Sequence, residues 1–296
     1  MMHRPAVWAG IALLGLACLV YGAWRMATRP HLRPPRNRSA VVLPERGFSH
    51  AAFESLLREF LDAEGRMDYA RLAADPAARE RLEGYLAALA AASPENAPER
   101  FPTPADRTAY WLYAYNALVV AAIVDHWPIE TVHDVRAPVE LVRGLGFFYV
   151  QRFILGGRTY SLYELEKTKA APRGGDPRVH FVLNCGSTSC PALQPNLPTG
   201  DDLERFLAER ARAFVHDPRH VRIDDEQRVV HVSRIFLWYE DDFIDDLRRR
   251  GRPADRGIVD VLAEHGGPDV RARLAGEWTV EPLPYDWSIA ATKEAK

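Results

Sequence analysis

Two cysteines and a histidine lie close together in the segment RVHFVLNCGSTSCP, which covers residues 178–191. The apolar run that opens this segment predicts a strand, in which His180 and Asn184 share one face. Cys185 follows the strand, and the small residues after it leave the backbone N–H groups of residues 186–188 free to face an anion. We therefore expect the chemistry of this protein at the junction of strand and loop.

Three kinds of chemistry fit these residue types, and the first is covalent catalysis. Cys185 would attack a carbonyl carbon, His180 or another histidine would act as the base, and the N–H groups that begin at Gly186 would bind the oxyanion. An ordinary thiol has a pKa of about 8.5, so this role needs a nearby positive charge or directed N–H groups. The spacing is unfavourable, because His180 and Cys185 lie on opposite faces unless the loop turns back.

The second possibility is a disulfide between Cys185 and Cys190 in an oxidising compartment. Four intervening residues that include Gly and Ser allow the two Cα atoms to approach to about 4.4–6.8 Å. Such a bridge would order the loop, and Asn184, Ser187 and Ser189 would then make the contacts of a binding site to which Gly186 and Cys190 also belong.

The third possibility is a zinc ion held by His180, Cys185 and Cys190, with water or another side chain as the fourth ligand. The ligand types fit, but His-x4-Cys-x4-Cys is not a familiar zinc spacing. The sequence contains no nucleotide-binding glycine loop and no haem motif, so we expect no other cofactor.

Asn116 is a further candidate, because it lies within the most apolar predicted helix of the chain. A buried amide without a partner would cost about 1–3 kcal/mol. We therefore expect Asn116 to bond to the backbone of a neighbouring loop, which could be the cysteine loop, or less often to contact a ligand directly.

The N-terminus predicts the cellular location. Residues 7–24 form an uncharged apolar run, which would span about 27 Å as a helix. Residues 1–24 are therefore a signal peptide or a membrane anchor, and the Arg- and Pro-rich residues 25–47 are a linker. We expect a membrane-anchored or secreted protein on the periplasmic side of the cell envelope, although the arginines after the run favour a cytoplasm-facing orientation as the alternative.

Composition limits the remaining classes. The chain of 296 residues is 47% hydrophobic and can bury a sizeable core. It carries 38 Lys and Arg against 40 Asp and Glu, so nucleic acid is not an expected partner. Three cysteines are too few for a disulfide scaffold in a chain of this length.

Hydrophobic periodicity predicts a helix-rich first half. Helices are expected behind Ser49 as an N-cap, over residues 77–92, and over residues 105–126, the last so apolar that most of its surface must be buried. Residues 147–162 then predict two strands joined by a Gly-Gly turn.

The second half predicts alternating helices and strands. Capping residues mark helices that begin near Ser161, Thr199 and Ser233, and the Ser233 helix is expected to continue through Phe243. A second hairpin is expected over residues 220–233. The predicted fold is α+β: a single domain over residues 48–290, with the helix-rich first half packed on a small, mostly antiparallel sheet that contains the cysteine strand, and a tail over residues 291–296.

Several separated motifs carry a family resemblance: YWLYAYNALVV, FILGGRTYSLYELE, DPRVHFVLNCGSTSCPAL, SRIFLWYEDDF and YDWSI. Their order and spacing resemble the domain of unknown function 547 family over roughly residues 50–290. The resemblance implies the fold and the position of the site more than a reaction. The chain departs from the family at Tyr113 and Ala290, where members usually or often carry Asn.

Two functional classes follow. One is a cysteine-dependent hydrolase or acyl transferase that uses Cys185 with His180. The other is a noncatalytic module that binds a small molecule or a peptide and has a disulfide-fixed loop.

Overall fold

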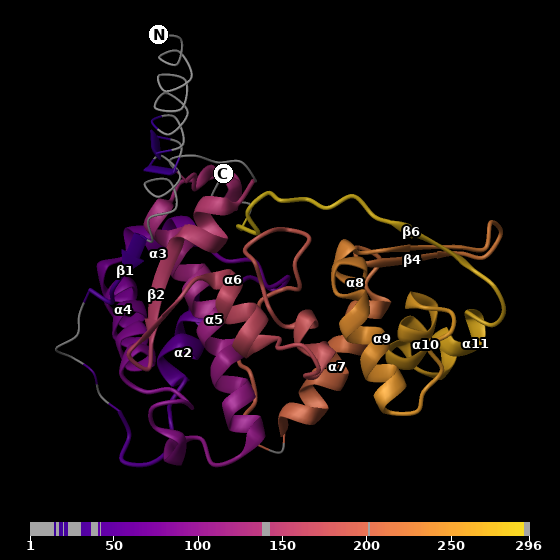
Figure 1. Cartoon of the computed structure of the whole chain (residues 1–296), viewed down its shortest axis with the longest axis horizontal. Helices are drawn as coiled ribbons and strands as arrows, with labels where there is room; N and C mark the ends of the chain where they lie inside the picture. The colour runs from indigo at the N-terminus through magenta and orange to yellow at the C-terminus, as the bar shows by residue number, and fades with distance from the viewer. Residues whose placement is uncertain are drawn as a thin grey trace, which may run out of the picture.

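Helix α5, Pro104–His126, lies at the centre of the first half of the chain (Figure 1). Thr103 and Asp106 form a capping box at its start, and Pro104 occupies the first turn, where its missing N–H costs no hydrogen bond. Every residue from Ala109 to Val124 is buried. This confirms the buried helix that the sequence predicts.

The computed structural model describes residues 15, 18–19, 21–22, 31–36, 41, 43–137, 143–200 and 202–292. None of the helices in these ranges is long and apolar enough to cross a membrane. The signal or anchor predicted for residues 7–24 lies almost entirely outside the described residues, as do residues 293–296 of the predicted tail.

The first hydrophobic core forms around α5 and the helices that pack near it: α2 Ala51–Phe60, α3 Tyr69–Ala74, α4 Pro76–Ala91 and α6 Leu162–Leu165. The predicted cap of α2 is wrong by one residue, because His50 occupies the N-cap position. The His50 ring is buried and stacks on Tyr113 with a centroid distance of 3.8 Å, and the helix begins at the next residue, Ala51.

A second hydrophobic core is built from the later helices: α7 Asp202–His216, α8 Arg234–Trp238, α9 Glu240–Arg249, α10 Ile258–Gly266 and α11 Pro268–Arg273. Ser233 caps α8 as predicted. The expected single helix through Phe243 is wrong, because the backbone departs from helical angles at Tyr239 and α9 begins after it. Thr199 is too far from the first residue of α7, Asp202, to cap that helix.

Two three-stranded sheets replace the single predicted sheet. The first has the order β1–β2–β3, with β1 His31–Arg33, β2 Gln151–Leu155 and β3 Arg158–Tyr160. The second has the order β4–β5–β6, with β4 Val221–Asp224, β5 Val229–Val232 and β6 Thr279–Pro282. Each combines one parallel and one antiparallel pair. Both predicted hairpins are present, and the α+β class is confirmed.

The turn of the first hairpin needs glycine. Gly156 and Gly157 have φ angles of 53° and 78°, the left-handed region that two-residue hairpin turns use. The residues before β2 differ from the prediction: Gly146–Val150 form a π-helical turn and not a strand.

The predicted cysteine strand is wrong. Pro177–Phe181 form a 3₁₀ helix, which Asp176 caps by accepting a hydrogen bond from the Arg178 N–H. Val179 packs in the first core, whereas Phe181 packs in the second. A helical turn can direct these nearby side chains into two different cores, which a strand that buries a single face does not do.

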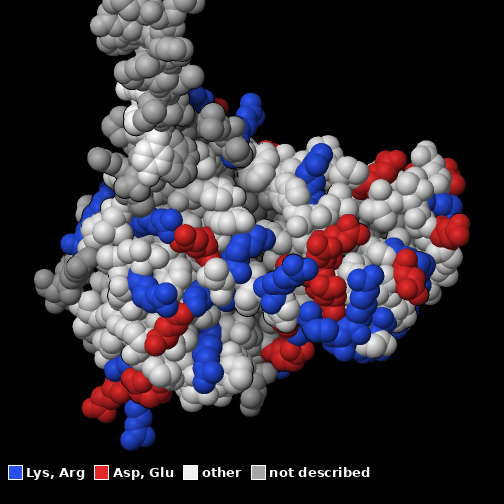
Figure 2. Space-filling model, viewed as in Figure 1, with Lys and Arg blue, Asp and Glu red and all other residues white. Residues whose placement is uncertain are grey.

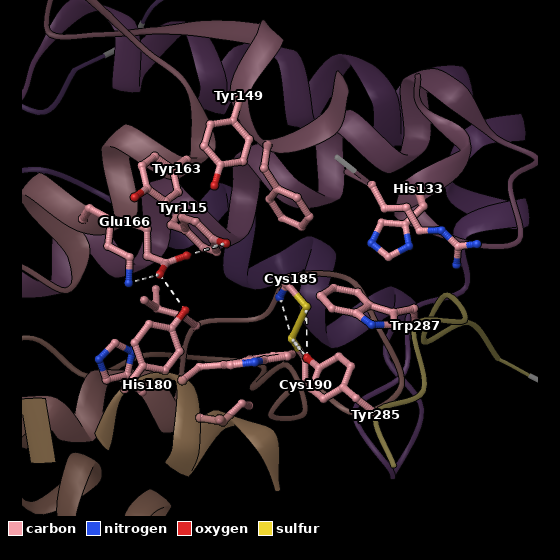
Figure 3. A pocket seen from close by; sticks show the side chains of 17 residues that line it. Tyr115, His133, Tyr149, Tyr163, Glu166, His180, Cys185, Cys190, Tyr285 and Trp287 are labelled. Carbon is pink, nitrogen blue, oxygen red and sulfur yellow. Dashed lines mark hydrogen bonds and ion pairs between the residues drawn. A yellow bond between two sulfur atoms is a disulfide. The ribbon is translucent and has the colours of Figure 1, made fainter. Parts of the chain in front are cut away.

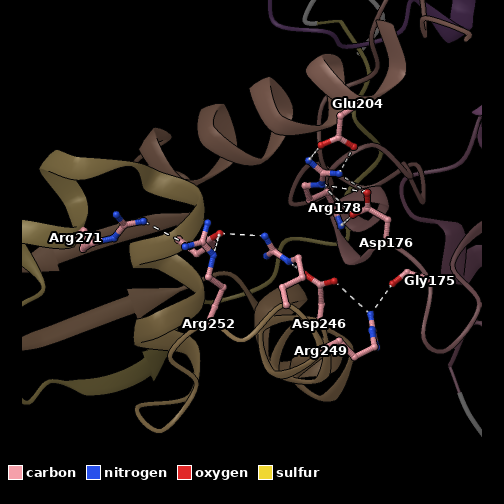
Figure 4. Close-up of polar contacts among 10 residues, drawn as sticks. Gly175, Asp176, Arg178, Glu204, Asp246, Arg249, Arg252 and Arg271 are labelled. Atoms are coloured by element: carbon pink, nitrogen blue, oxygen red, sulfur yellow. Dashed lines mark hydrogen bonds and ion pairs between the residues drawn. The ribbon is translucent and has the colours of Figure 1, made fainter. Parts of the chain in front are cut away.

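Charged side chains reinforce this connection (Figure 4). The Arg178 guanidinium bonds to Asp176 at 2.5 Å and to Glu204 of α7 at 2.6 Å. Arg249 of α9 donates to the Gly175 carbonyl oxygen at 3.1 Å. The segment that leads to the cysteines is thus held to the second core on two sides.

The predicted linker contributes to the fold. Within residues 25–47, strand β1 pairs in parallel with β2. The Arg33 side chain, 11% exposed, forms ion pairs with Glu83 of α4 and Asp125 of α5, both at 2.5 Å. Residues 31–36 are therefore attached to the first core.

Candidate functional site

A cavity of about 490 Å³ lies beside the cysteine loop (Figure 3). It is bounded by α5, the π-helical turns at Gly146–Val150 and Glu166–Ala170, α8 and the segment after β6. Eight aromatic side chains line it: Tyr115, Phe148, Tyr149, Tyr163, Trp238, Tyr239, Tyr285 and Trp287. The predicted residues His180, Cys185 and Cys190 lie in the same wall.

The two cysteines form a disulfide, with their Cα atoms 6.1 Å apart. This is the second of the three arrangements that the sequence allows. In this state Cys185 has no free thiol, and the covalent mechanism has no nucleophile there. Neither do the described residues contain a group of three His, Cys, Asp or Glu side chains placed to hold a metal ion.

The buried amides of Asn116 and Asn184 shape the loop. Asn116 Oδ1 accepts from the Asn184 N–H at 2.9 Å, and Asn116 Nδ2 donates to the Val182 carbonyl oxygen at 3.2 Å. Asn184 in turn accepts from the Gly186 N–H and donates to the Pro191 carbonyl oxygen, both at 2.7 Å. Asn116 bonds to the cysteine loop as the sequence predicts, and neither amide lines the cavity.

The expected anion-binding N–H groups are already engaged. The Gly186 N–H bonds to Asn184, and the Thr188 N–H donates to the Ser288 carbonyl oxygen at 2.8 Å. Ser187 is fully buried. The prediction that this run of N–H groups faces an anion is therefore wrong for residues 186 and 188, because the C-terminal segment and Asn184 use them.

His180 lines the cavity but does not pair with a cysteine. Its ring is buried and stacks on Tyr239, with centroids 3.7 Å apart. Its Nε2 atom lies 3.1 Å from Asp242 Oδ2, and this hydrogen bond lowers the pKa of the Asp242 carboxyl below its ordinary value. His180 was expected to act with Cys185, but in the structure its hydrogen-bond partner is Asp242.

Tyr285 covers the disulfide from the C-terminal segment. Its hydroxyl lies 3.4 Å from Cys185 Sγ and 3.2 Å from Cys190 Sγ, and it accepts a hydrogen bond from Ser187 Oγ at 3.1 Å. Burial raises the pKa of Tyr285 to about 12. The hydroxyl therefore keeps its proton at neutral pH and can donate it to a sulfur atom.

Glu166 is the carboxylate of the cavity wall. Tyr239 donates to it at 2.7 Å and Tyr115 at 3.3 Å, and Lys167 Nζ lies 3.3 Å away. Burial raises the pKa values of both tyrosines well above the ordinary value, so both remain donors. The Lys167 ammonium also lies 4.2 Å from the centroid of the Tyr239 ring. The negative charge of Glu166 is thus compensated by Lys167 and by the two tyrosine hydroxyls.

The sequence did not identify Glu166, Tyr285 and Trp287 as site residues. They lie far from the cysteine loop along the chain, and helical or strand periodicity does not report on such distant contacts. One signal was available: Glu166 is the last residue of the SLYELE motif, and the YDWSI motif contains Tyr285 and Trp287.

Comparison with known proteins finds a family model that matches part of the chain. Residues 100–215 match a family model described as "Protein of unknown function, DUF547". The match includes α5, Glu166 and the disulfide, whereas Tyr285 and Trp287 lie beyond it. No curated protein and no solved structure matches the chain. The order of motifs and this match agree: residues 100–215 are similar to the domain of unknown function 547 family.

Proposed function

We propose that this domain is a module that binds a small molecule with a planar, apolar body and an anionic group. The observation that carries the proposal is the aromatic wall of the cavity. A volume of about 490 Å³ is in the ordinary range for small-molecule sites, which are lined mainly by apolar and aromatic side chains.

The exposure of these rings supports the proposal. Trp238, Tyr149 and Tyr163 are 47%, 43% and 41% exposed, whereas large aromatic side chains are often buried in a core. Large apolar side chains that gather around one cavity mark interaction sites, whereas isolated ones need no explanation. A flat ligand would cover these rings and remove them from water.

The charges at the cavity favour an anionic group on the ligand. Lys167 already balances Glu166. Arg143 is exposed at the cavity and has no ion-pair partner among the described residues. A carboxylate or phosphate would satisfy its guanidinium with paired hydrogen bonds.

The surface argues against a polyanionic partner. Figure 2 shows Lys and Arg interspersed with Asp and Glu on the visible face. Such a mixture offers no extended basic track for a nucleic acid backbone. A hydrolase or acyl transferase is less well supported, because the Cys185 sulfur is bonded to Cys190 and His180 is engaged with Asp242.

Calorimetric titration with 2-naphthoate and its uncharged partner, 2-naphthamide, tests the proposal. We expect the carboxylate to bind at least about tenfold more tightly, the size expected for a charge-assisted hydrogen bond. Arg143→Gln should remove this preference. Arg158→Gln is the matched control, because Arg158 is exposed but lies outside the cavity lining. Equal binding of the two compounds, or no binding of either, would contradict the proposal.

A further inference from the structure

The disulfide occupies an unusual place for a structural cross-link, because both of its cysteines line the cavity. Cys190 is only 7% exposed, whereas Cys185 is partly exposed. A small thiol that enters the cavity therefore reaches Cys185 Sγ more readily than Cys190 Sγ. Figure 3 shows the sulfur–sulfur bond between the Tyr285 ring and the open cavity.

Polar groups surround both sulfur atoms, and a backbone N–H donates to the less accessible one. Cys185 Sγ lies 3.1 Å from Ser187 Oγ and 3.4 Å from the Tyr285 hydroxyl. The Cys185 backbone N–H donates to Cys190 Sγ at 3.0 Å, and the Tyr285 hydroxyl lies 3.2 Å from the same atom. Ser187 Oγ donates to the Tyr285 oxygen, which leaves the Tyr285 proton available for sulfur. Donors placed where negative charge develops stabilise a leaving thiolate.

The loop does not depend on the disulfide for its position. Asn116 bonds to the backbone on one side of it, and the N–H groups of Thr188 and Ser189 donate to the carbonyl oxygens of Ser288 and Asp286 on the other. None of these hydrogen bonds involves a sulfur atom, so opening the sulfur–sulfur bond removes none of their donors or acceptors. The fold can therefore hold both the oxidised and the reduced pair.

From this geometry we propose that Cys185 and Cys190 form a thiol–disulfide exchange site for a small dithiol that enters the aromatic cavity. This activity goes beyond ligand binding, because it assigns a group transfer to the wall of the cavity.

The reaction balances in two steps. A substrate thiolate attacks Cys185 Sγ, a new sulfur–sulfur bond forms, and the electron pair of the old bond goes to Cys190 Sγ, which leaves as a thiolate. The second thiol of the substrate, as its thiolate, then attacks the substrate sulfur of this mixed disulfide, and Cys185 leaves as a thiolate. The substrate is oxidised to a disulfide and the cysteine pair is reduced. The reverse reaction with a second, disulfide-bearing compound restores the pair.

The test is the rate at which dithiothreitol reduces the native full-length chain, followed by acid quenching, alkylation and intact mass. Cys18→Ser provides the background, so that only Cys185 and Cys190 can be alkylated. We expect reduction without loss of the near-ultraviolet circular dichroism of the folded protein. Tyr285→Phe should slow it by about fivefold, because one donor to the leaving sulfur is lost. Tyr160→Phe, which alters a tyrosine outside the cavity lining, should not change the rate.

Single cysteine variants test the assigned polarity. With bis(2-hydroxyethyl) disulfide as the probe, the free Cys185 of the Cys190→Ser chain should form a mixed disulfide about tenfold faster than the free Cys190 of the Cys185→Ser chain. Reduction that occurs only as the protein unfolds, or equal rates for the two single variants, would overturn the inference. Because the readout is a covalent mass, these outcomes are separate from those of the naphthoate titration.

Discussion

Asn116 connects the most buried helix of the protein to the loop that carries the disulfide. It is 3% exposed, and both ends of its amide are bonded to the backbone at Asn184 and Val182. An apolar replacement leaves a buried N–H and a buried carbonyl oxygen without these partners. Asn116 therefore acts on the site by positioning the loop.

We predict that Asn116→Leu lowers the free energy of unfolding by about 2–4 kcal/mol, because each buried group left unpaired costs about 1–3 kcal/mol. Chemical denaturation monitored by circular dichroism measures this change. Leu118→Met, in the same buried helix, is the control and should cost less than about 1.5 kcal/mol. The role of Asn116 would be refuted by an Asn116→Leu chain as stable as the control.

Some of the site was predictable residue by residue, and some was not. The buried amide of Asn116 required a hydrogen-bond partner, and the four residues between Cys185 and Cys190 allowed a disulfide. The positions of Glu166 and Tyr285 could not be deduced in this way, because their contacts depend on how distant segments pack. The resemblance to the family pointed to their motifs without giving their geometry.

The cysteine loop packs tightly against α5 at Gly186. This residue has a φ angle of 91°, and a Cβ atom built there would lie 2.5 Å from Ile123 Cδ1 and 3.3 Å from Val132 Cγ1. Glycine thus permits both the left-handed turn and the close approach. The position of the cysteine loop against α5 therefore depends on the close contact between Gly186 and Ile123.

Gly186→Ala should destabilise the protein more than Gly157→Ala. Both residues have positive φ angles, 91° and 78°, so both substitutions strain the backbone. Gly157 has open space around its missing Cβ, whereas Gly186 has Ile123. We expect an additional cost of about 1–3 kcal/mol at Gly186 from overpacking, measured as the difference in unfolding free energy. Equal costs would mean that the loop can move away from α5.

An element could be predicted from the sequence when its own residues determine its conformation, and not when packing against distant residues does. The apolar run of α5 and the Gly-Gly hairpin carry local signals, and both were located from the sequence. Residues 177–181 begin a segment with strand-like alternation, but their helical turn is set by two cores that receive Val179 and Phe181 on different sides. A local pattern contains no information on that second core.

Helix α7 connects the two cores, because Leu203 packs in the first and Phe214 in the second, and two other connections join the cores as well. The first connection is the segment from Pro177 to the cysteines. The second is the C-terminal segment, which crosses back from β6 toward the first core (Figure 1) and bonds through Ser288 to the loop and through Ile289 to Glu130. This return brings Tyr285 and Trp287 to the cavity. The aromatic wall is therefore a product of the complete fold.

Buried histidines in both parts of the molecule predict acid sensitivity. Burial lowers the pKa of His50 to about 3, and those of His220 and His265 to about 4, whereas an unfolded histidine has a pKa of about 6.5. Between these values the unfolded chain binds protons that the folded chain does not. Stability is thus complete above about pH 6.5 and falls as the pH decreases toward 4.

We expect each of these histidines to reduce the unfolding free energy by about 1 kcal/mol between pH 6.5 and 5.5. Denaturant titrations at pH 7.5, 6.5 and 5.5 measure the total loss. His265→Gln should remove about a third of the loss that the three histidines cause, and the exposed His31→Gln should leave it unchanged. A stability that does not vary over this pH range would contradict the burial of neutral histidines.

The most direct test of the binding site is fluorine NMR of the chain labelled with 5-fluorotryptophan and titrated with 2-naphthoate. Trp238 and Trp287 line the cavity with ring centroids 5.8 Å apart, whereas Trp278 lies elsewhere, beside Arg228. Single Trp→Phe variants assign the signals. We predict that the Trp238 and Trp287 signals shift together and saturably while Trp278 does not move. Unchanged cavity signals, or an equal shift at Trp278, would contradict the account.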